Sequence, residues 1–426
     1  MPDKRWRRWL VTGVGVILVL AFLAMTAGAA GVTWTNPQVV SIGSSNVKAV
    51  DLALAGDGNP QAVWSEGTGT GKQVTVYQAS ASFSDGKWVW PGPDKIVEEN
   101  QRGAPSLAVD SNDRLHVVYL NSDGSKVRYG LKDGTSPWTH TDIDPPAGFT
   151  IAEGTAGAPV IRIAGLTLHV VWFHKDTGVP EQYNQIVHAF STDTGKTWQA
   201  EEVYHSPDNK HSYYPDLAID QDGKLHVVWE EGTTASAKIY HAVGTFDGSG
   251  VSWDTPSIVS GSLTDCHRPS IAIVGNQLYV AWGQYGGSKT NQNVYYSTKS
   301  ASGGAWPAPK LLPNSNVGVG DLTPTYVSPR IKATSDGRVI IVWNGYPVEG
   351  GAEAIHFTET TNIADNNAWT ERSTVSSGSG ISYGPAVVLE DNGVVHVMWV
   401  KVADHSTAVH TYSQYQIFLP LVLKNR

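Results

Sequence analysis

A pattern of about fourteen residues recurs seven times along the chain. It consists of a proline, a short apolar run, a polar turn, and two or three β-branched residues that end on Trp or Tyr. The closing aromatics lie 53 to 61 residues apart, and a period of this length indicates a supersecondary unit repeated around a ring or along a solenoid. The copies span residues 50–64, where the proline is missing, and 105–119, 159–172, 215–229, 269–282, 329–343 and 385–399.

Each copy predicts two strands joined by a tight turn. A sheet tolerates proline at the first residue of a strand, so a first strand begins at each repeat proline. Turns such as Asp222-Gly223 and Asn392-Gly393 supply the positive φ that a tight hairpin requires. A Val-rich second strand then ends on Trp or Tyr, a third strand follows a variable loop, and a fourth strand opens on another Trp.

The number of fourth strands predicts how the repeats close. Only six copies are followed by a fourth strand, whereas a matching pattern stands before the first copy, at residues 34–40. We therefore predict an all-β fold, a seven-bladed β-propeller of four-stranded antiparallel blades whose N-terminal strand pairs with the last three and leaves no free edge. Thirteen of the sixteen Trp residues are explained by packing between sheets, while Trp88 has no assigned place.

The chain begins with the pattern of an export signal. Four basic residues precede an apolar stretch that runs to about residue 25, and small residues follow at 27–29. We expect residues 1–30 to be a signal peptide, which makes the protein secreted or displayed on the cell surface. The alternative is a retained N-terminal anchor, because the stretch approaches the roughly 20 residues that span a bilayer. Residues 31–415 are the expected propeller, and residues 416–426 form an apolar tail that is either a sorting signal or a packed peptide.

Charge and cysteine content narrow the possible functions. Removal of the first thirty residues takes away four positive charges and one negative charge, which moves the formal charge from −9 to about −12. A protein this acidic is not expected to bind nucleic acid. The single Cys266 excludes an internal disulfide framework. We expect a monomer without a cofactor that meets a membrane only through its N-terminal segment, if that segment is retained.

One hairpin carries a recognisable motif. The run Ser191-Thr-Asp193-Thr-Gly195-Lys-Thr197-Trp198 resembles the Asp-box, Ser-x-Asp-x-Gly-x-Thr-Trp, of sialidase-like (BNR-repeat) propellers. In that role Asp193 and Ser191 bond the turn backbone, Gly195 takes a left-handed conformation, and Trp198 fills the gap between blades. In that family the box is structural and lies on the face away from the active site, so it identifies a fold and not a reaction.

The chain departs from the catalytic members of the family it resembles. Catalytic sialidases have six blades, whereas the pattern here counts seven. They also carry a Phe-Arg-Ile-Pro-like motif on an early blade, for which the nearest match here is Arg268-Pro269.

Charged residues interrupt two rings of small residues around the expected axis. The first strands line the axis of a propeller, so the positions just after each proline share one ring and the positions two residues further share another. Asp51, Asp216 and Arg330 stand in the first ring, and Arg162 and Lys332 stand in the second. Two interpretations remain open: a salt-bridge cluster around water, or an anion or sugar pocket in which Arg330 grips a carboxylate with two N–H groups.

Further residues on the same face extend this candidate site. Arg102 and Arg268 lie in loops that lead into first strands, so they can converge with Arg330 on one carboxylate, as three arginines do in sialidases. The predicted ligand-binding residues are Arg102, Arg268, Arg330, Asp51, Asp216, Tyr214 and Tyr326. The resemblance also implies a Tyr nucleophile activated by a Glu, with a separate acid, and the candidates for these catalytic roles are Tyr383, Glu230 and Asp265.

Histidines occupy one repeated position and raise the question of a metal site. His116, His169, His226 and His396 share a register of the second strand, but equivalent positions in separate blades do not converge. We expect a repeated hydrogen bond within each blade and no metal. The run 265–268, with Asp, Cys, His and Arg in sequence, is the more suggestive polar cluster because it precedes a first strand.

These observations lead to two hypotheses. The first is a sialidase-like propeller that recognises glycans or other acidic ligands at one end of its axis, with an exo-acting glycoside hydrolase of sialidase-like type as its catalytic form. The second is a non-catalytic propeller that serves as a binding module or scaffold at the cell surface.

Overall fold

The computed structural model describes residues 32–41, 46–67, 74–96, 101–149, 151–175, 183–206, 210–233, 235–285, 292–315, 327–346, 352–376 and 379–414. The expected signal peptide, the apolar tail and Tyr326 lie outside these residues. No helix in the described part of the chain is long and apolar enough to cross a membrane.

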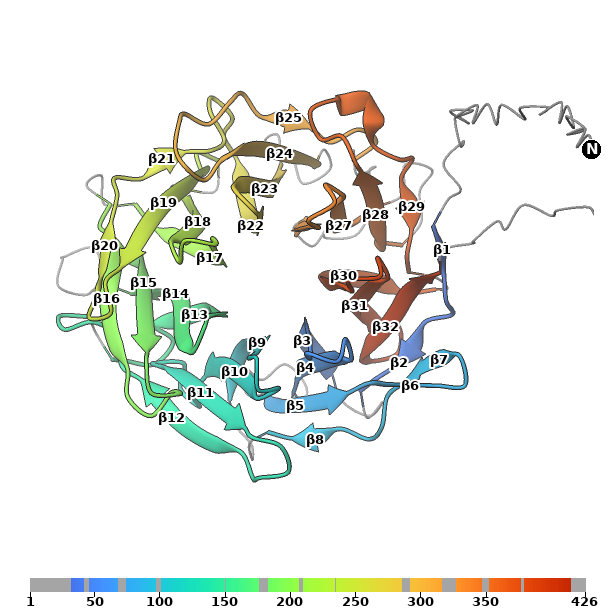
Figure 1. Cartoon of the computed structure of the whole chain (residues 1–426), viewed down its shortest axis with the longest axis horizontal. Coiled ribbons are helices and arrows are strands. Elements are labelled where there is room, and N and C mark those ends of the chain that lie inside the picture. Colours follow the sequence, from blue (N-terminus) through green and yellow to red (C-terminus); the bar gives the residue numbers. More distant parts are fainter. Residues whose placement is uncertain are drawn as a thin grey trace, which may run out of the picture. The chain divides into compact units, whose positions relative to one another are not determined.

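Seven antiparallel sheets, counted over the described residues, are arranged in a ring around a central space (Figure 1). This confirms the predicted all-β propeller. The first three blades comprise β3 (Asn46–Leu54), β4 (Pro60–Gly67), β5 (Thr75–Ser80) and β8 (Asp94–Lys95); β9 (Arg102–Val109), β10 (Leu115–Leu120), β11 (Val127–Lys132) and β12 (Thr139–Ile143); and β13 (Ala156–Ala164), β14 (Thr167–Lys175), β15 (Asn184–Ser191) and β16 (Gln199–Tyr204).

The remaining four blades continue the same order around the ring. Blade 4 comprises β17 (Ser212–Ile219), β18 (Leu225–Glu231), β19 (Lys238–Phe246), β20 (Val251–Trp253) and β21 (Ser257–Ile258). Blades 5 and 6 comprise β22 (Cys266–Val274), β23 (Gln277–Gln284), β24 (Asn293–Ser300) and β25 (Lys310–Leu311), then β26 (Arg330–Ala333), β27 (Val339–Gly345), β28 (Ala354–Thr360) and β29 (Ser373–Thr374), with the 3-10 turn η1 (Asn366–Ala368) before β29. Blade 7 comprises β30 (Ile381–Leu389), β31 (Val395–Val402) and β32 (Ser406–Gln414), completed by β1 (Thr33–Trp34) and β2 (Gln38–Val39).

The ring closes through the N-terminal strands, as the repeat count predicts. Trp34 of β1 pairs with Ser413 of β32, and Val39 of β2 pairs with Val409 of the same strand. The last blade therefore obtains its outer edge from the beginning of the propeller, and its sheet does not end on β32.

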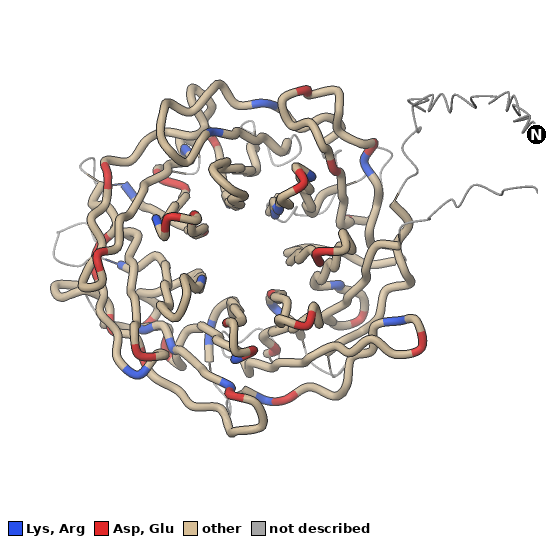
Figure 2. Tube along the Cα trace, viewed as in Figure 1, with Lys and Arg blue, Asp and Glu red and all other residues tan. Residues whose placement is uncertain are grey.

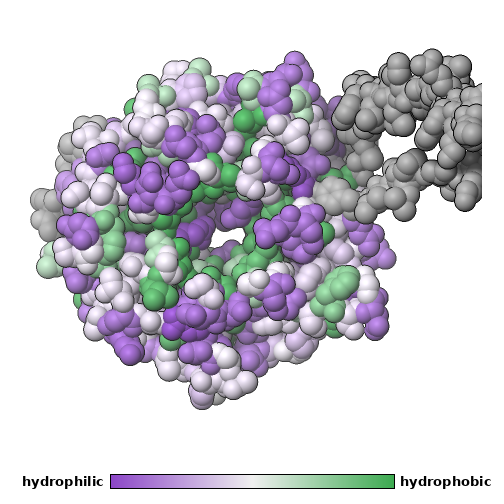
Figure 3. Space-filling view, viewed as in Figure 1, coloured by the Kyte–Doolittle hydropathy of each residue, from purple (hydrophilic) through white to green (hydrophobic). Residues whose placement is uncertain are grey.

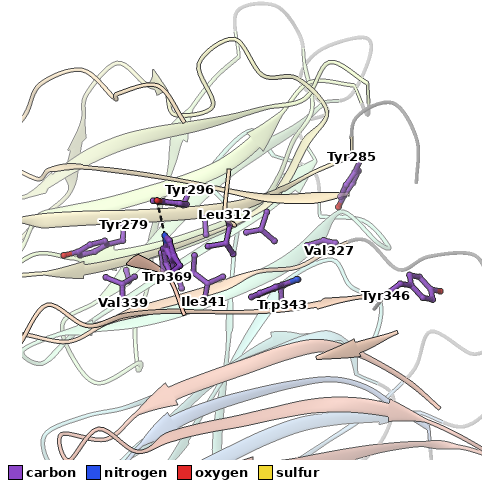
Figure 4. Packing of buried hydrophobic residues seen from close by; sticks show 14 residues of the cluster. Tyr279, Tyr285, Tyr296, Leu312, Val327, Val339, Ile341, Trp343, Tyr346 and Trp369 are labelled. Carbon is purple, nitrogen blue, oxygen red and sulfur yellow. Dashed lines mark hydrogen bonds between the residues drawn. The ribbon is translucent and has the colours of Figure 1, made fainter. Parts of the chain in front are cut away.

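Large aromatic side chains fill the spaces between blades. Six of the second strands carry a fully buried Trp, and each strand continues beyond the Trp at which the sequence pattern predicts its end: Trp64, Trp172, Trp229, Trp282, Trp343 and Trp399. Between blades 5 and 6, Trp369 stands edge-on to the ring of Tyr296, with the two ring centroids 5.3 Å apart. Its indole N–H donates to the Tyr296 hydroxyl at 3.1 Å (Figure 4). Such pairs add to the free energy gained from burial because edge and face carry opposite partial charges.

The hairpin of residues 191–198 makes the local bonds expected of its motif. Asp193 accepts from the backbone and hydroxyl of Thr197 at 2.9 and 2.7 Å, and these bonds lower its pKa to about 2. Gly195 has a φ of +81°, and a Cβ there would lie 2.1 Å from the ring of Tyr129 in the preceding blade. Trp198 stands edge-on to the same ring at 5.2 Å. The motif therefore fixes its own turn and docks blade 3 on blade 2.

The repeated histidines bond within their own blades, as predicted. In three blades a second-strand His meets a third-strand His through Nδ1 and Nε2, at 3.0 to 3.1 Å: His169 with His188, His226 with His241, and His396 with His410. In blade 2 the partner is a tyrosine, because His116 Nδ1 lies 2.7 Å from the Tyr129 hydroxyl. Within the described residues, no group of three or more His, Cys, Asp or Glu is arranged to hold a metal ion.

Trp88, which the sequence pattern leaves without a place, joins blade 1 to blade 7. It lies in the short hairpin of β6 (Ser82–Ser84) and β7 (Lys87–Val89) and is buried against Tyr412. Its ring stands edge-on to His396 at 5.3 Å. The hairpin thus packs across the junction at which the ring closes.

Candidate functional site

The inner strands enclose a cavity of about 410 Å³ on the axis. The opening at the centre of the ring is visible in Figure 3, and Figure 2 shows charged positions of both signs on the strands around it. The first-ring residues line this cavity from all seven blades, as expected: Asp51, Ser106, Val160, Asp216, Ser270, Arg330 and Ala386. From the second ring, Ala53, Ala108, Arg162, Lys332 and Val388 line it.

The two aspartates of the first ring connect neighbouring blades. Asp51 accepts from its own neighbour Leu52 N at 2.9 Å and from Leu107 N of the next blade at 3.0 Å. Asp216 repeats this arrangement with Leu217 N at 2.9 Å and Ile271 N at 3.0 Å. Carboxylates that accept backbone N–H groups in this way satisfy donors that the sheets leave open at the axis. The sequence did not reveal this role, because the partners are backbone groups one blade away.

Arg162 forms an ion pair within the lining of the cavity. Its Nη2 donates to Asp216 Oδ1 at 3.0 Å, and its Nη1 donates to Ile161 O at 2.8 Å. The expected salt-bridge cluster is therefore present in part, and it uses Arg162 and Asp216.

Arg330 and Lys332 are not compensated in the same way. Arg330 donates to Pro329 O at 3.3 Å and has no ion pair with a carboxylate in the described chain. Lys332 makes no hydrogen bond or ion pair with any described residue. Both are half-buried, and burial lowers the pKa of each, while Asp216 and Asp51 oppose the decrease. These two cations are the groups in the cavity that an anion can satisfy.

The charge balance of the cavity is opposite in sign to that of the whole chain. The lining holds four cations, Arg162, Arg268, Arg330 and Lys332, against the carboxylates of Asp51 and Asp216. The lining therefore carries two net positive charges on a chain with a formal charge of −9. A concave, partly desolvated site with this balance attracts anions and concentrates them at the axis.

Blades 4 and 5 shape the rim of the cavity through two residues with unusual backbone. Tyr214 and Arg268 both precede a repeat proline, and their φ angles are +48° and +52°. The Arg268 guanidinium lies over the Tyr214 ring, 4.5 Å from its centroid, and both residues line the cavity. Positive φ is rare for such side chains and is disfavoured before proline, so the surrounding structure must hold them there.

A buried acid–histidine–acid cluster lies behind Arg268. Glu230 Oε2 accepts from Arg268 N at 2.8 Å and lies 3.4 Å from His267 Nδ1. Asp265 Oδ1 lies 3.1 Å from His267 Nε2. Burial by itself lowers the pKa of His267, but the hydrogen bonds and charges of Glu230 and then Asp265 outweigh it and raise that pKa. Tyr285 stacks on the imidazole at 4.5 Å. His267 was not among the predicted site residues, although the polar run 265–268, which spans the beginning of β22, pointed to it.

Four of the predicted site residues do not line this cavity: Glu230 and Asp265 lie behind Arg268, and Arg102 and Tyr383 lie elsewhere. Arg102 donates through Nη2 to Glu153 Oε1 at 2.6 Å and is not among the residues that line the cavity, so the three arginines do not converge. Tyr383 belongs to blade 7 and packs against the apolar cluster between blades 7 and 1. Burial raises its pKa, and the charge of Glu353 raises it further.

The catalytic trio expected from the resemblance is therefore not assembled as predicted. Glu230 and Asp265 meet at His267, on blades 4 and 5, whereas Tyr383 stands on blade 7, which neighbours neither. A Tyr nucleophile also needs a lowered pKa or an adjacent base, and the shift at Tyr383 is in the other direction. Tyr285 stacks on His267 of this cluster, and Tyr214 lies against the guanidinium of the adjoining Arg268.

Comparison with known proteins identifies the class of fold. No protein-family model and no curated protein matches the sequence. Among solved structures, a protein of unknown function from Dyadobacter fermentans is 13% identical, with a TM-score of 0.52 over 76% of this chain and 98% of that chain. A mutant of NanB sialidase from Streptococcus pneumoniae is 12% identical, with a TM-score of 0.50 over 88% of this chain and 70% of that one.

A leech intramolecular trans-sialidase in complex with 2,7-anhydro-Neu5Ac is 11% identical, with a TM-score of 0.50 over 91% of this chain and 70% of that one. At such identities the likeness shows the fold alone. That fold is a sialidase-like β-propeller, in agreement with the resemblance carried by residues 191–198.

Proposed function

We propose that this protein is an exported binding propeller that recognises an acidic ligand, such as the carboxylated end of a glycan, in its axial cavity. The observation that carries the proposal is that Arg330 and Lys332 have no carboxylate ion pair among the described residues and stand in a lining of net positive charge. Arg330 grips a carboxylate with two parallel N–H groups, and Lys332 supplies a second, point-like charge. Tyr214 offers a ring at the rim, against which a sugar face can pack.

Calorimetric titration with 3′-sialyllactose and with neutral lactose tests this proposal. We expect the acidic sugar to bind and the neutral one not to bind. Arg330→Gln removes the bidentate contact and should weaken binding by about tenfold or more, equivalent to about 1.4 kcal/mol or more. Arg102→Gln is the matched control, because Arg102 is paired with Glu153 outside the cavity, and it should leave affinity unchanged. Equal binding of both sugars, or full affinity in Arg330→Gln, contradicts the proposal.

A second candidate function is glycoside hydrolysis at the junction of blades 4 and 5. It is favoured by one observation: Tyr214 and Glu230 both contact Arg268. Tyr214 meets its guanidinium, and Glu230 accepts its backbone N–H. Glu230 is in turn linked to Asp265 through His267, which lies between the two carboxylates. A retaining mechanism requires these types of residue. A panel of fluorogenic aryl glycosides that includes a sialoside tests it, with Tyr214→Phe and Glu230→Gln as variants. Release that both variants abolish supports hydrolysis, and no release from any substrate contradicts it.

Export is part of the proposal and has its own test. Expression of the full chain in a bacterial host, followed by fractionation and mass spectrometry of the N-terminus, distinguishes cleavage near residue 30 from a retained anchor. Protein that stays entirely in the cytoplasm contradicts export. Surface display with ligand binding but without hydrolysis agrees with the scaffold form of the hypothesis.

A further inference from the structure

We propose that His267 is a positioning residue that holds Arg268 at the rim of the axial cavity, so that acidic ligands bind more tightly when His267 carries a proton. The inference rests on the proposed function for its ligand, but its structural step can be tested in the free protein. The inference concerns His267, a residue to which the resemblance to sialidases gives no role.

The geometry around His267 is that of a charged imidazole between two carboxylates. Nδ1 faces Glu230 at 3.4 Å and Nε2 faces Asp265 at 3.1 Å, and both ring nitrogens can donate at once only in the protonated form. His267, Glu230 and Asp265 are all buried, so a change in charge here is poorly screened.

Several elements packed against this cluster contribute groups that influence the protonation of His267. Glu230 comes from β18, and Tyr213, which pairs with it, comes from β17. Asp265 precedes β22, and Tyr285, whose ring stacks on His267, follows β23. Arg268 adds a nearby positive charge. The two carboxylates dominate this environment, because they are the groups that raise the pKa of His267.

Glu230 links the proton to the rim of the cavity. The same oxygen, Oε2, that faces His267 accepts the backbone N–H of Arg268 at 2.8 Å. That bond holds Arg268 at its left-handed φ of +52°, from which its guanidinium reaches the ring of Tyr214 and the cavity. Holding a strained residue in place requires such surrounding contacts.

Loss of the proton changes both the geometry and the charge at the rim. A neutral His267 can donate to only one of its two carboxylates, so one of these contacts is lost. Two carboxylates then stand behind Arg268 with no cation between them, and they draw its guanidinium away from the ligand and weaken the positive field of the cavity. Acidic ligands should therefore bind less tightly as pH rises through the titration of His267.

The first experiment follows the free protein by NMR. With labelled histidine and tyrosine, we expect the ring signals of Tyr214 to shift with the same midpoint as those of His267, because Arg268 lies on the Tyr214 ring. His267→Gln assigns the histidine signal and should abolish the Tyr214 transition. A Tyr214 signal that does not follow the His267 titration overturns the inference, whether or not any ligand binds.

The second experiment measures the affinity for 3′-sialyllactose from pH 5 to 9, where its carboxylate stays ionised. We expect Kd to rise about three- to tenfold across the His267 midpoint, a coupling typical of linked sites. Glu230→Gln should move that midpoint to lower pH, because it removes the charge that favours the protonated ring. His267→Gln should give a flat profile at the weak level, a result that a purely structural role would not produce.

His205→Gln is the matched control, because His205 also faces a carboxylate, that of Glu202 at 3.0 Å, but lies half-exposed outside the axial cavity. It should keep the wild-type pH profile. A Kd that is flat across the His267 midpoint in the wild type overturns the inference. Absence of binding at every pH contradicts the proposed function instead, and the NMR experiment then decides the positioning role by itself.

Discussion

The indole N–H of Trp90, in blade 1, donates to Nδ1 of His410, in blade 7, at 3.1 Å. An indole can only donate, so Nδ1 of His410 carries no proton and its Nε2–H donates to His396 Nδ1 at 3.0 Å. His396 in turn donates from Nε2 to Glu390 Oε1 at 2.6 Å. One tautomer of each histidine satisfies the whole chain of bonds, and burial holds the pKa of His410 well below its usual value.

Trp90→Phe should loosen the junction of blades 1 and 7. The substitution keeps the aromatic packing but leaves Nδ1 of a buried histidine without its donor, which costs about 1–3 kcal/mol of the free energy of unfolding. Urea unfolding measures the change.

Trp306→Phe serves as the control for Trp90→Phe. Trp306 also stands edge-on to a third-strand histidine, His241, at 5.3 Å, but its indole N–H has no hydrogen-bond partner among the described residues. Trp306→Phe should therefore lower the free energy of unfolding by clearly less than Trp90→Phe does. Equal losses in the two variants would show that the Trp90–His410 hydrogen bond has no special weight.

Stability should fall steeply as the solution is acidified below about pH 6.5. Burial lowers the pKa of His169 to about 3 and that of His356 to about 4, and it lowers the pKa of His188, His226, His241 and His410 as well. The unfolded chain takes up these protons near pH 6.5 while the folded protein does not. Each such group therefore stabilises the fold fully above pH 6.5 and loses about 1.4 kcal/mol per pH unit below it, until its folded pKa is reached.

Thermal unfolding between pH 8 and pH 4.5 tests this expectation. His169→Gln should reduce the slope of Tm against pH, because it removes one of the titrating groups. The raised pKa of His267 acts in the opposite direction, but as a single group it offsets only part of the loss. A Tm that is constant over this range would contradict the assignment of neutral, buried histidine pairs.

Asp216→Asn should destabilise the ring more than Asp51→Asn. In both variants an amide N–H₂ replaces an acceptor oxygen, so a backbone N–H at the axis loses its partner, at a cost of about 1–3 kcal/mol. Asp216→Asn also leaves Arg162 without its ion pair, which adds to the loss. Guanidinium unfolding of the two variants gives the comparison. The order would be reversed if the Arg162–Asp216 pair contributed nothing and Asp51 held the more important blade contact.

Gly195→Ala should cost about 2–4 kcal/mol, because its new methyl group would collide with the ring of Tyr129 and its φ of +81° is unfavourable for alanine. Gly223→Ala is the control. It has a similar φ of +77°, but nothing lies within 4 Å of the added methyl group, so only the backbone strain of about 1 kcal/mol remains. Equal unfolding midpoints for the two variants would contradict tight docking of blade 3 on blade 2.

The blades and their closure could be predicted from the sequence because the same pattern of residues repeats at a nearly constant spacing. A turn and a closing Trp or Tyr recur in every unit and the proline recurs in six of the seven, and the unmatched strand near Trp34 had only one place to pair. The ring of residues after the prolines was predictable for the same reason. Its chemistry was not, because Asp51 and Asp216 bond backbone groups of the following blade, which no side-chain pattern records.

The candidate site was predicted less well for identifiable reasons. Arg102 and Arg268 were expected in loops, but Arg102 opens β9 and Arg268 lies within β22, because these first strands begin before the repeat prolines. Arg102 also pairs with Glu153, and sequence does not show which nearby acid will compete for an arginine. The order of the blades alone could have excluded a contact between Tyr383 and Glu230, because blades 7 and 4 are not neighbours. The position of His267 between two carboxylates could not be predicted, because Glu230 is distant from it in the sequence and comes beside it only in the folded protein.

The pairing of β1 with β32 also affects when folding can be completed. Thr33 and Gln414, which are joined through a hydrogen bond, are 381 positions apart in the chain, and bringing such distant segments together costs roughly 5 kcal/mol of chain entropy. Until that late event, β32 presents unpaired backbone groups to any passing strand, including one from another copy of the protein. Folding at high concentration therefore competes with intermolecular exchange of the first strand, and dilution or a chaperone should raise the yield of monomer.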